Sequence, residues 1–146
     1  MLGGDDTLII TGEAPRGTLE AGWDYDEGVN WNIDSNTFEY ITNGQTYTVT
    51  VEGKLGGLSG SWGDDILVGN DENNAFKGNG GDDLVQGLGG DDLFFFHWTG
   101  GDNAEHPKKI TAEGGTGDDK YYFEGFAGEH IIKEEEGFET IIFGRK

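Results

Sequence analysis

The residues of this chain best suited to chemistry are acidic and amide side chains that recur at a fixed spacing. Asp65, Asn74, Asp83 and Asp92 follow one another at intervals of nine residues. Side-chain oxygens in such a series are typical ligands of hard cations, which prefer oxygen donors. The chain has no cysteine, which excludes disulfides and thiolate metal sites. The spacing therefore predicts a repeated cation site.

These residues belong to a nonapeptide repeat. The six copies are MLGGDDTLI from Met1, GSWGDDILV from Gly60, GNDENNAFK from Gly69, GNGGDDLVQ from Gly78, GLGGDDLFF from Gly87 and GGTGDDKYY from Gly114. Their sixth column holds Asp6, Asp65, Asn74, Asp83, Asp92 and Asp119. Their eighth column holds Leu8, Leu67, Phe76, Val85, Phe94 and Tyr121. Low-complexity acidic sequence would not keep a large apolar residue in one column, so the repeat is structural.

The columns predict how each repeat folds. Six glycine-rich residues form a tight turn, with glycine where the backbone must reach positive φ or approach a ligand closely. The next three residues form a short strand whose middle side chain points inward. If two repeats make one coil, residues 18 positions apart stack, which places Asp65 over Asp83 and Asn74 over Asp92.

Carboxylates stacked in this way repel one another unless a cation lies between them. Ca²⁺ fits best, because it accepts six to eight oxygen ligands at about 2.3–2.6 Å in flexible geometry. Mg²⁺ demands stricter octahedral geometry, and Zn²⁺ prefers nitrogen and sulfur ligands. We expect two or more Ca²⁺ ions. The predicted ligands are Asp65, Asp83, Asn74, Asp92 and Asp119, with backbone carbonyls around Gly60, Trp62, Asp64, Gly78, Gly80, Asp82, Gly87, Gly89 and Asp91.

Three positions depart from the pattern. Asn74 replaces the acid of the sixth column, and the same copy carries Glu72 in place of glycine. We therefore expect the cation site of Asn74 and Asp92 to be weaker. Asp6 has no partner in phase with it. Asp119 is in phase with Asp65 and Asp83 if residues 96–113 form an irregular coil, whereas it pairs with Asp83 or Asp92 if they loop out. Both arrangements are compatible with the spacing.

The pattern GGxGxDxUx, where U is a large apolar residue, resembles the RTX (haemolysin-type calcium-binding) repeat. The resemblance implies a right-handed parallel β-roll in a bacterial protein that is secreted unfolded by the type I pathway and folds on meeting extracellular calcium. It carries the ligand role onto the sixth-column residues from Asp65 to Asp119. The family joins such rolls to toxins, proteases, lipases, alginate epimerases and adhesins, so it predicts no particular activity.

We expect an all-β chain that forms a single module over residues 1–146. Its predicted parts are a partial repeat at 1–10, a β-rich insert at 11–59, four tandem repeats at 60–95, an irregular loop at 96–113, and a last repeat with a β-rich cap at 114–146. Tyr121, Phe123, Ile131, Ile141 and Phe143 are the expected core of the cap, and residues 134–136 are expected to form a solvated turn.

The insert contains a hairpin signal. Asn43-Gly44 suits a two-residue type I′ turn, which pairs Tyr40 with Tyr47 and Phe38 with Val49. Its apolar face, completed by Val51, is expected to pack on the roll or on Trp23 and Trp31. The upstream segment AGWDYDEGVNW offers Asp24, Asp26 and Glu27 as a further cation site, or Trp23, Tyr25 and Trp31 as a glycan platform. We favour a plain turn with its aromatic residues packed on the hairpin.

Charge and motifs exclude several functions. The formal net charge of −20 disfavours nucleic acid and anionic membranes, and no apolar run approaches the roughly 20 residues of a membrane span. His97, His106 and His130 form no HExxH motif, and GxSxG is absent, so we expect no enzyme in this chain.

The function that we predict is calcium-dependent folding that stabilises or presents flanking domains of a larger secreted protein. The alternatives are an adhesin-like module that binds a polysaccharide or cell surface through the insert, and an accessory module of a secreted epimerase or protease.

Overall fold

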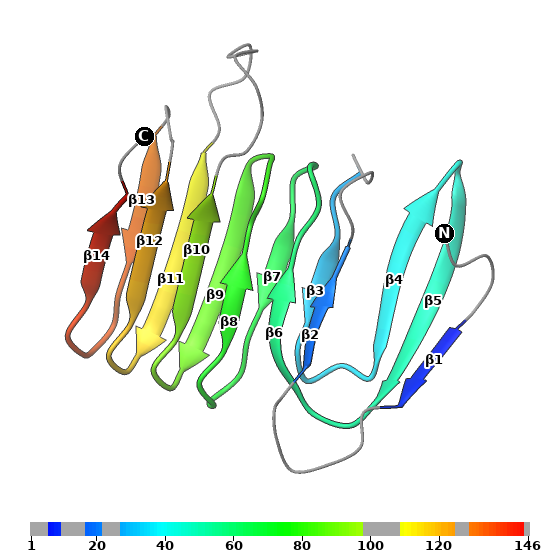
Figure 1. Ribbon diagram of the computed structural model, residues 1–146, viewed down its shortest axis with the longest axis horizontal. Helices are drawn as coiled ribbons and strands as arrows, with labels where there is room; N and C mark the ends of the chain where they lie inside the picture. The colour runs from blue at the N-terminus through cyan, green and yellow to red at the C-terminus, as the bar shows by residue number, and fades with distance from the viewer. Residues whose placement is uncertain (1–5, 10–16, 22–26, 98–108, 125–128, 145–146) are drawn as a thin grey trace.

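The computed structural model describes residues 6–9, 17–21, 27–97, 109–124 and 129–144. These residues form fourteen strands in three sheets and no helix, so the expected all-β fold with parallel sheets is confirmed. Figure 1 shows the strands in a row, from the hairpin of β4 (Thr37–Thr42) and β5 (Gln45–Glu52) at one end to β14 (Thr140–Phe143) at the other. No helix in the described part of the chain is long and apolar enough to cross a membrane.

Most strands belong to two parallel sheets. One sheet contains, in spatial order, β14, β12 (Lys120–Glu124), β10 (Leu93–His97), β8 (Ala75–Lys77), β6 (Leu55–Ser59) and β2 (Gly17–Glu20). The other contains β13 (His130–Lys133), β11 (Ile110–Thr116), β9 (Asp83–Gly89), β7 (Ile66–Val68) and β3 (Asn30–Asn32). From β6 to β14 the chain alternates between the two sheets, so every second strand returns to the same sheet one step further along.

The register confirms the predicted spacing within the tandem repeats and resolves the position of Asp119. Leu67 pairs with Val85 and Phe76 with Phe94, each 18 residues apart. The next step is nine residues longer, since Phe94 pairs with Tyr121. Asp119 therefore lies next to Asp92 and outside the Asp65 column.

The predicted irregular loop at 96–113 is wrong at both of its ends. Residues 96 and 97 complete β10, and Ile110 begins β11, which pairs with β9 and β13. Residues 98–108, including His106, lie outside the described residues. The prediction failed at both ends because residues 110–113 lack the motif, although their alternating apolar and polar side chains suit a strand.

The eighth column of the repeat forms the core, as predicted. Leu67, Phe76, Val85, Phe94 and Tyr121 are all 0% exposed. The ring of Phe94 stacks on those of Phe76 and Tyr121, with centroids 5.2 and 4.6 Å away. Burying one such large side chain contributes about 1.5–3 kcal/mol, so a single apolar residue per repeat can support the stack despite the glycine-rich sequence.

The insert at 11–59 is only partly a separate unit. Its strands β2, β3 and β6 extend the two parallel sheets, where β3 pairs with β7 and β6 with β8. Only β4 and β5 form a third sheet, joined by β1 (Asp6–Ile9) in parallel with β5. Since Asp6 pairs with Val49, β1, the described part of the partial repeat, lies apart from the other copies. Sequence periodicity missed β2, β3 and β6 because they lack the acidic column.

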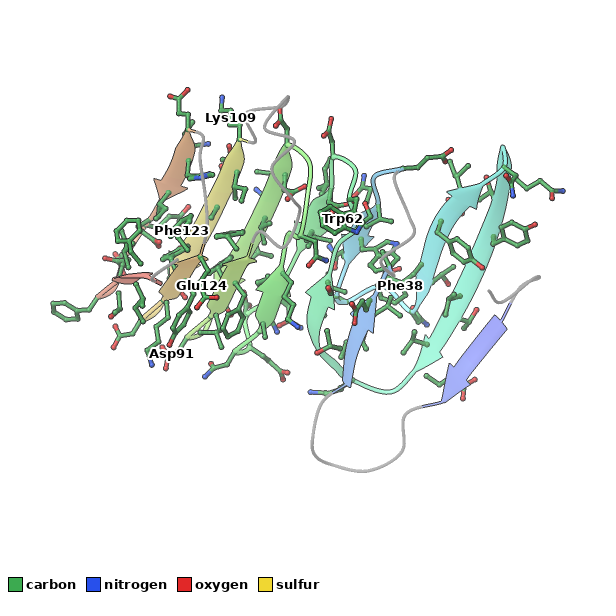
Figure 2. All side chains as sticks on the ribbon, turned by 45° about the horizontal axis from the view of Figure 1, so that its top comes forward. Phe38, Trp62, Asp91, Lys109, Phe123 and Glu124 are labelled. Carbon is green, nitrogen blue, oxygen red and sulfur yellow. The ribbon has the colours of Figure 1, made fainter. Side chains whose placement is uncertain are left out.

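The hairpin has the predicted register. Tyr40 pairs with Tyr47 and Phe38 with Val49, and both Asn43 and Gly44 have positive φ, of 53° and 72°, as a type I′ turn requires. Figure 2 shows Phe38 on the side of the hairpin that faces the parallel sheets. Phe38 is 1% exposed and meets Trp31 edge to face, with ring centroids 5.8 Å apart. The packing on Trp31 is thus confirmed, whereas Trp23 lies outside the described residues.

The C-terminal segment is β-rich as expected and contains β12, β13 and β14, but its predicted core is partly wrong. Tyr121 and Phe123 are buried and Ile131 is half-buried, whereas Ile141 is 48% and Phe143 78% exposed. Both exposed residues lie on β14, the outermost strand of its sheet, and no further strand covers it in the described part of the chain. The alternation of apolar residues predicted the strand correctly but could not show that it is an edge.

Candidate metal centre

The sixth-column residues from Asp65 to Asp119 are buried at two corners of the stack. Asp65 and Asp83 lie at the ends of the turns that lead into β7 and β9, and they are 1% and 3% exposed. Asn74, Asp92 and Asp119 lie in the same way before β8, β10 and β12, and they are 0–3% exposed. Figure 2 marks the two opposite corners with Lys109 and Asp91. Four carboxylates are thus withdrawn from water, where charged groups need compensation.

One oxygen of each buried carboxylate joins neighbouring coils. The backbone N–H of Asp65 donates to Asp83 Oδ1 at 3.1 Å, and that of Asp92 donates to Asp119 Oδ1 at 2.8 Å. The N–H of Asn74 reaches Asp92 Oδ1 at 2.7 Å. Each coil therefore offers a backbone donor to the acid of the coil that follows.

The exposed acids of the fifth column form a second ladder in the opposite direction. The backbone N–H of Asp82 donates to Asp64 Oδ1 at 2.8 Å, and that of Asp118 donates to Asp91 Oδ1 at 3.0 Å. Each tandem Asp-Asp pair from Asp64-Asp65 onward thus ties its coil to both neighbours. This role was missed from the sequence, where only the carbonyls of Asp64, Asp82 and Asp91 were predicted to take part.

The second oxygen of the buried carboxylates divides the sites into two kinds. Asp65 Oδ2 accepts the backbone N–H of Ser61 at 2.8 Å, and the Ser61 hydroxyl donates to Asp65 Oδ1 at 2.8 Å. By contrast, Asp92 Oδ2 and Asp119 Oδ2 are buried and accept no hydrogen bond from any described residue. A buried carboxylate oxygen without a donor calls for a proton or a cation.

Electrostatics at the Asp92 corner disfavour the anionic form. Burial raises the pKa of Asp92 to about 7, although the N–H of Asn74 acts in the opposite direction, and the charge of Asp119 adds to the rise. Burial likewise raises the pKa of Asp119 and of Asp65. A cation at this corner would offset the free-energy cost of burying these negative charges and would reduce the repulsion between them.

The first-column glycines bring a carbonyl beside these oxygens. A Cβ on Gly87 would collide with Asp92 Oδ2 and would lie 2.6 Å from the carbonyl oxygen of Gly114. A Cβ on Gly69 would lie 2.6 Å from Asn74 Oδ1 and 2.5 Å from the Gly87 carbonyl oxygen. Glycine in this column therefore leaves room for two oxygens, one from a side chain and one from the backbone of the next coil.

The structure places only some of the predicted carbonyl ligands beside side-chain oxygens of the column. Those of Gly78 and Gly87 lie beside side-chain oxygens of the preceding coil, Asp65 Oδ2 and Asn74 Oδ1 respectively. The Gly60 carbonyl accepts a hydrogen bond from the Asn79 amide at 2.7 Å. The Gly114 carbonyl was missed, although the repeat at 114–122 could have indicated it. The carbonyls around Trp62, Asp64, Gly80, Asp82, Gly89 and Asp91 stay predictions.

Side chains alone do not complete a metal site. Among the described residues, no group of three or more His, Cys, Asp or Glu side chains could hold a metal ion. The acids meet in pairs, so an ion between coils needs backbone oxygens as well, which Ca²⁺ accepts readily. Of the upstream candidates, Glu27 is exposed, while Asp24 and Asp26 lie outside the described residues.

The alternative of a glycan platform does not hold for Trp31. This side chain is 4% exposed, and its Nε1–H donates to the Glu39 carbonyl at 2.9 Å. It belongs to the core and cannot stack on a sugar. Trp23 and Tyr25 lie outside the described residues.

Comparison with known proteins adds no relative. No protein-family model matches the chain, and no curated protein matches it either. The chemistry of the two corners therefore has to be argued from their own geometry.

In a chelating buffer, acid is expected to stabilise the fold. Burial raises the pKa of the Asp92 carboxyl from its usual 3.8 to about 7 in the folded chain, so the folded state binds the proton more tightly than the unfolded state does. This contribution to stability is fully present below about pH 4 and is lost as pH rises through 7. Circular dichroism of the chelated chain between pH 4.5 and 8 should show a β-sheet signal that falls with rising pH. Asp92→Asn should flatten this dependence, and a β-sheet signal that rises with pH would contradict it.

Proposed function

We propose that this chain is a calcium-binding module built as a parallel β-roll, and that it folds fully only when Ca²⁺ is bound. The observation that carries the proposal is the pair of buried oxygens, Asp92 Oδ2 and Asp119 Oδ2, which accept no hydrogen bond from the described residues. They lie on adjacent coils, and the Gly114 carbonyl lies beside the first of them.

The donor set favours Ca²⁺ over other cations. Every candidate ligand is a carboxylate, amide or carbonyl oxygen, which suits a hard ion with flexible coordination. The step between Asp92 and Asp119 is the strongest candidate site. Asp65 is a weaker ligand because the backbone and hydroxyl of Ser61 already satisfy its carboxylate.

Calcium would act by neutralising charge between coils. The chain carries a net charge of −20 and only 34% hydrophobic residues, a combination that keeps chains disordered unless something compensates the repulsion. An ion that binds only the folded state stabilises it by about 2.7 kcal/mol per site at a hundredfold excess over Kd. In this proposal the chain stays unfolded at the low calcium of the cytosol and folds outside the cell, where it supports the protein to which it is attached.

A calcium titration tests the proposal directly. The chain is stripped with EDTA, returned to pH 7, and followed by far-UV circular dichroism as Ca²⁺ is added. We expect a cooperative rise in β-sheet signal with a midpoint of about 10⁻⁴–10⁻³ M, the range of extracellular calcium modules. Mg²⁺ at the same concentrations should have little effect. A stripped chain that is already fully folded and does not respond to Ca²⁺ would refute the proposal.

A further inference from the structure

Residues 134–142 form a seventh, degenerate repeat that the motif does not reveal. Tyr121 pairs with Ile141 and Glu113 with Lys133, so this segment continues the stack at a spacing of 20 residues. The sequence EEEGFETII then places Gly137 in the fourth column, Glu139 in the sixth and Ile141 in the eighth. The first column, glycine in the five copies from residue 60 onward, holds Glu134.

The Glu134 side chain turns back onto the preceding coil instead of into solvent. The hydroxyl of Tyr121, which is 0% exposed, donates a hydrogen bond to Glu134 Oε1. The other oxygen, Glu134 Oε2, is buried and accepts no hydrogen bond from the described residues. The nearby cation Lys133 pairs with Glu113 at 2.6 Å and so is engaged elsewhere. The expectation that residues 134–136 form a solvated turn is therefore wrong for Glu134.

Three oxygens converge beside Gly114. Asp119 Oδ2, the Tyr121 hydroxyl and Glu134 Oε2 all lie within 2.6 Å of the point where a Cβ of Gly114 would be. Any two of them are thus separated by at most twice that distance. Two oxygens bound to one Ca²⁺ ion are likewise at most about 5 Å apart. Asp119 is 0% exposed, and its unpartnered Oδ2 points into this cluster.

We propose that Asp119 and Glu134 hold a further divalent cation, of the calcium class, at the last step of the acidic column. This inference rests on the proposed calcium function and adds a ligand, Glu134, that stands where the repeat has glycine. The Tyr121 hydroxyl orients the Glu134 carboxylate, so that Oε2 faces Asp119. A surface cavity of about 450 Å³, lined by Glu113, Gly115, Lys133, Glu134 and others, lies beside Glu134.

The number of bound ions tests this inference. Isothermal titration calorimetry with CaCl₂ is run on the full chain and on Glu134→Gln, which keeps the size of the side chain and removes its charge. We expect the variant to bind one ion fewer than the wild type. Glu135→Gln is the matched control, since it makes the same change at the next, exposed residue, and it should bind as many ions as the wild type.

The outcomes separate this inference from the proposed function. An unchanged number of ions and unchanged affinities in Glu134→Gln would overturn the terminal site alone, while calcium uptake by the wild type would still support the module. A wild type that takes up no calcium would overturn both. Should Glu134→Gln fail to reach the calcium-bound circular dichroism spectrum, Glu134→Gly restores the glycine of the repeat and is expected to lose the same single ion.

Discussion

Replacing Gly81 by alanine is expected to lower the free energy of unfolding of the stack by more than about 3 kcal/mol. Gly81 has φ of +100°, which side-chain-bearing residues rarely adopt. A Cβ there would lie 2.8 Å from the backbone nitrogen of Asp64 and would collide with the carbonyl of Gly63. Both atoms are backbone of the adjacent coil, so the clash can be relieved only by separating the coils. Losses of this size are exceptional for single substitutions and need such a cause.

Gly44→Ala is the matched control for this effect. Gly44 also has positive φ, of 72°, but a Cβ there would meet no atom within 4 Å. Its cost is the backbone strain alone, about 1–2 kcal/mol. Urea unfolding of both variants in saturating calcium measures the difference, which reports the close approach of the coils. Equal losses in the two variants would mean that coil spacing at Gly81 is not what the glycine protects.

Asp92→Asn is expected to change stability in opposite directions with and without calcium. Asparagine keeps the oxygen that accepts the N–H of Asn74 but carries no charge. Without calcium it removes a buried anion whose pKa is raised to about 7, so the β-sheet signal of the EDTA-treated chain should increase at pH 7. With calcium it removes a charged ligand from the column, so the calcium midpoint should rise at least tenfold, which corresponds to about 1.4 kcal/mol.

Asp91→Asn provides the comparison for Asp92→Asn. Asp91 is the neighbouring acid, but its side chain is exposed and its Oδ1 accepts the N–H of Asp118. The same loss of one charge at this position should shift the calcium midpoint only slightly, because surface charges are screened by solvent. Circular dichroism of both variants and the wild type measures the β-sheet signal without calcium and the midpoint of the calcium titration. If Asp92→Asn leaves the calcium midpoint unchanged, the carboxylate serves only as a hydrogen-bond acceptor, a role that the asparagine oxygen retains.

The two ladders of acids explain why the tandem Asp-Asp pair suits this fold whether or not an ion is bound. The exposed member accepts a backbone N–H from the following coil, and the buried member accepts one from the preceding coil. Hydrogen bonds to charged acceptors contribute more than neutral ones, about 1.5–3 kcal/mol each. In the buried ladder only one carboxylate oxygen accepts such a bond at Asp92 and Asp119. The other oxygen is the one that we propose binds a cation, so in this proposal structure and metal binding use different atoms of the same side chain.

The sequence by itself determined those features that depend on local periodicity. The nine-residue repeat specified the buried eighth column and the 18-residue stacking of Asp65 on Asp83, because each repeat contains its own turn and strand. The alternation around Asn43-Gly44 specified the hairpin register, because a two-residue turn leaves only one pairing. Each of these follows from residues close together in the chain.

Only the tertiary structure decided the rest. Asp119 pairs with Asp92 because the coil between them is nine residues longer, and no local signal shows whether such residues keep the register or leave it. The roles of Glu134, Ile141 and Phe143 depend on which coil lies beside them and on which strand is outermost. Whether a buried carboxylate oxygen has a donor, as in Asp65, or lacks one, as in Asp92, depends on atoms brought together from separate coils. Contacts between coils depend on the packing of the whole stack. A repeating motif predicts these contacts only where the repeat is unbroken.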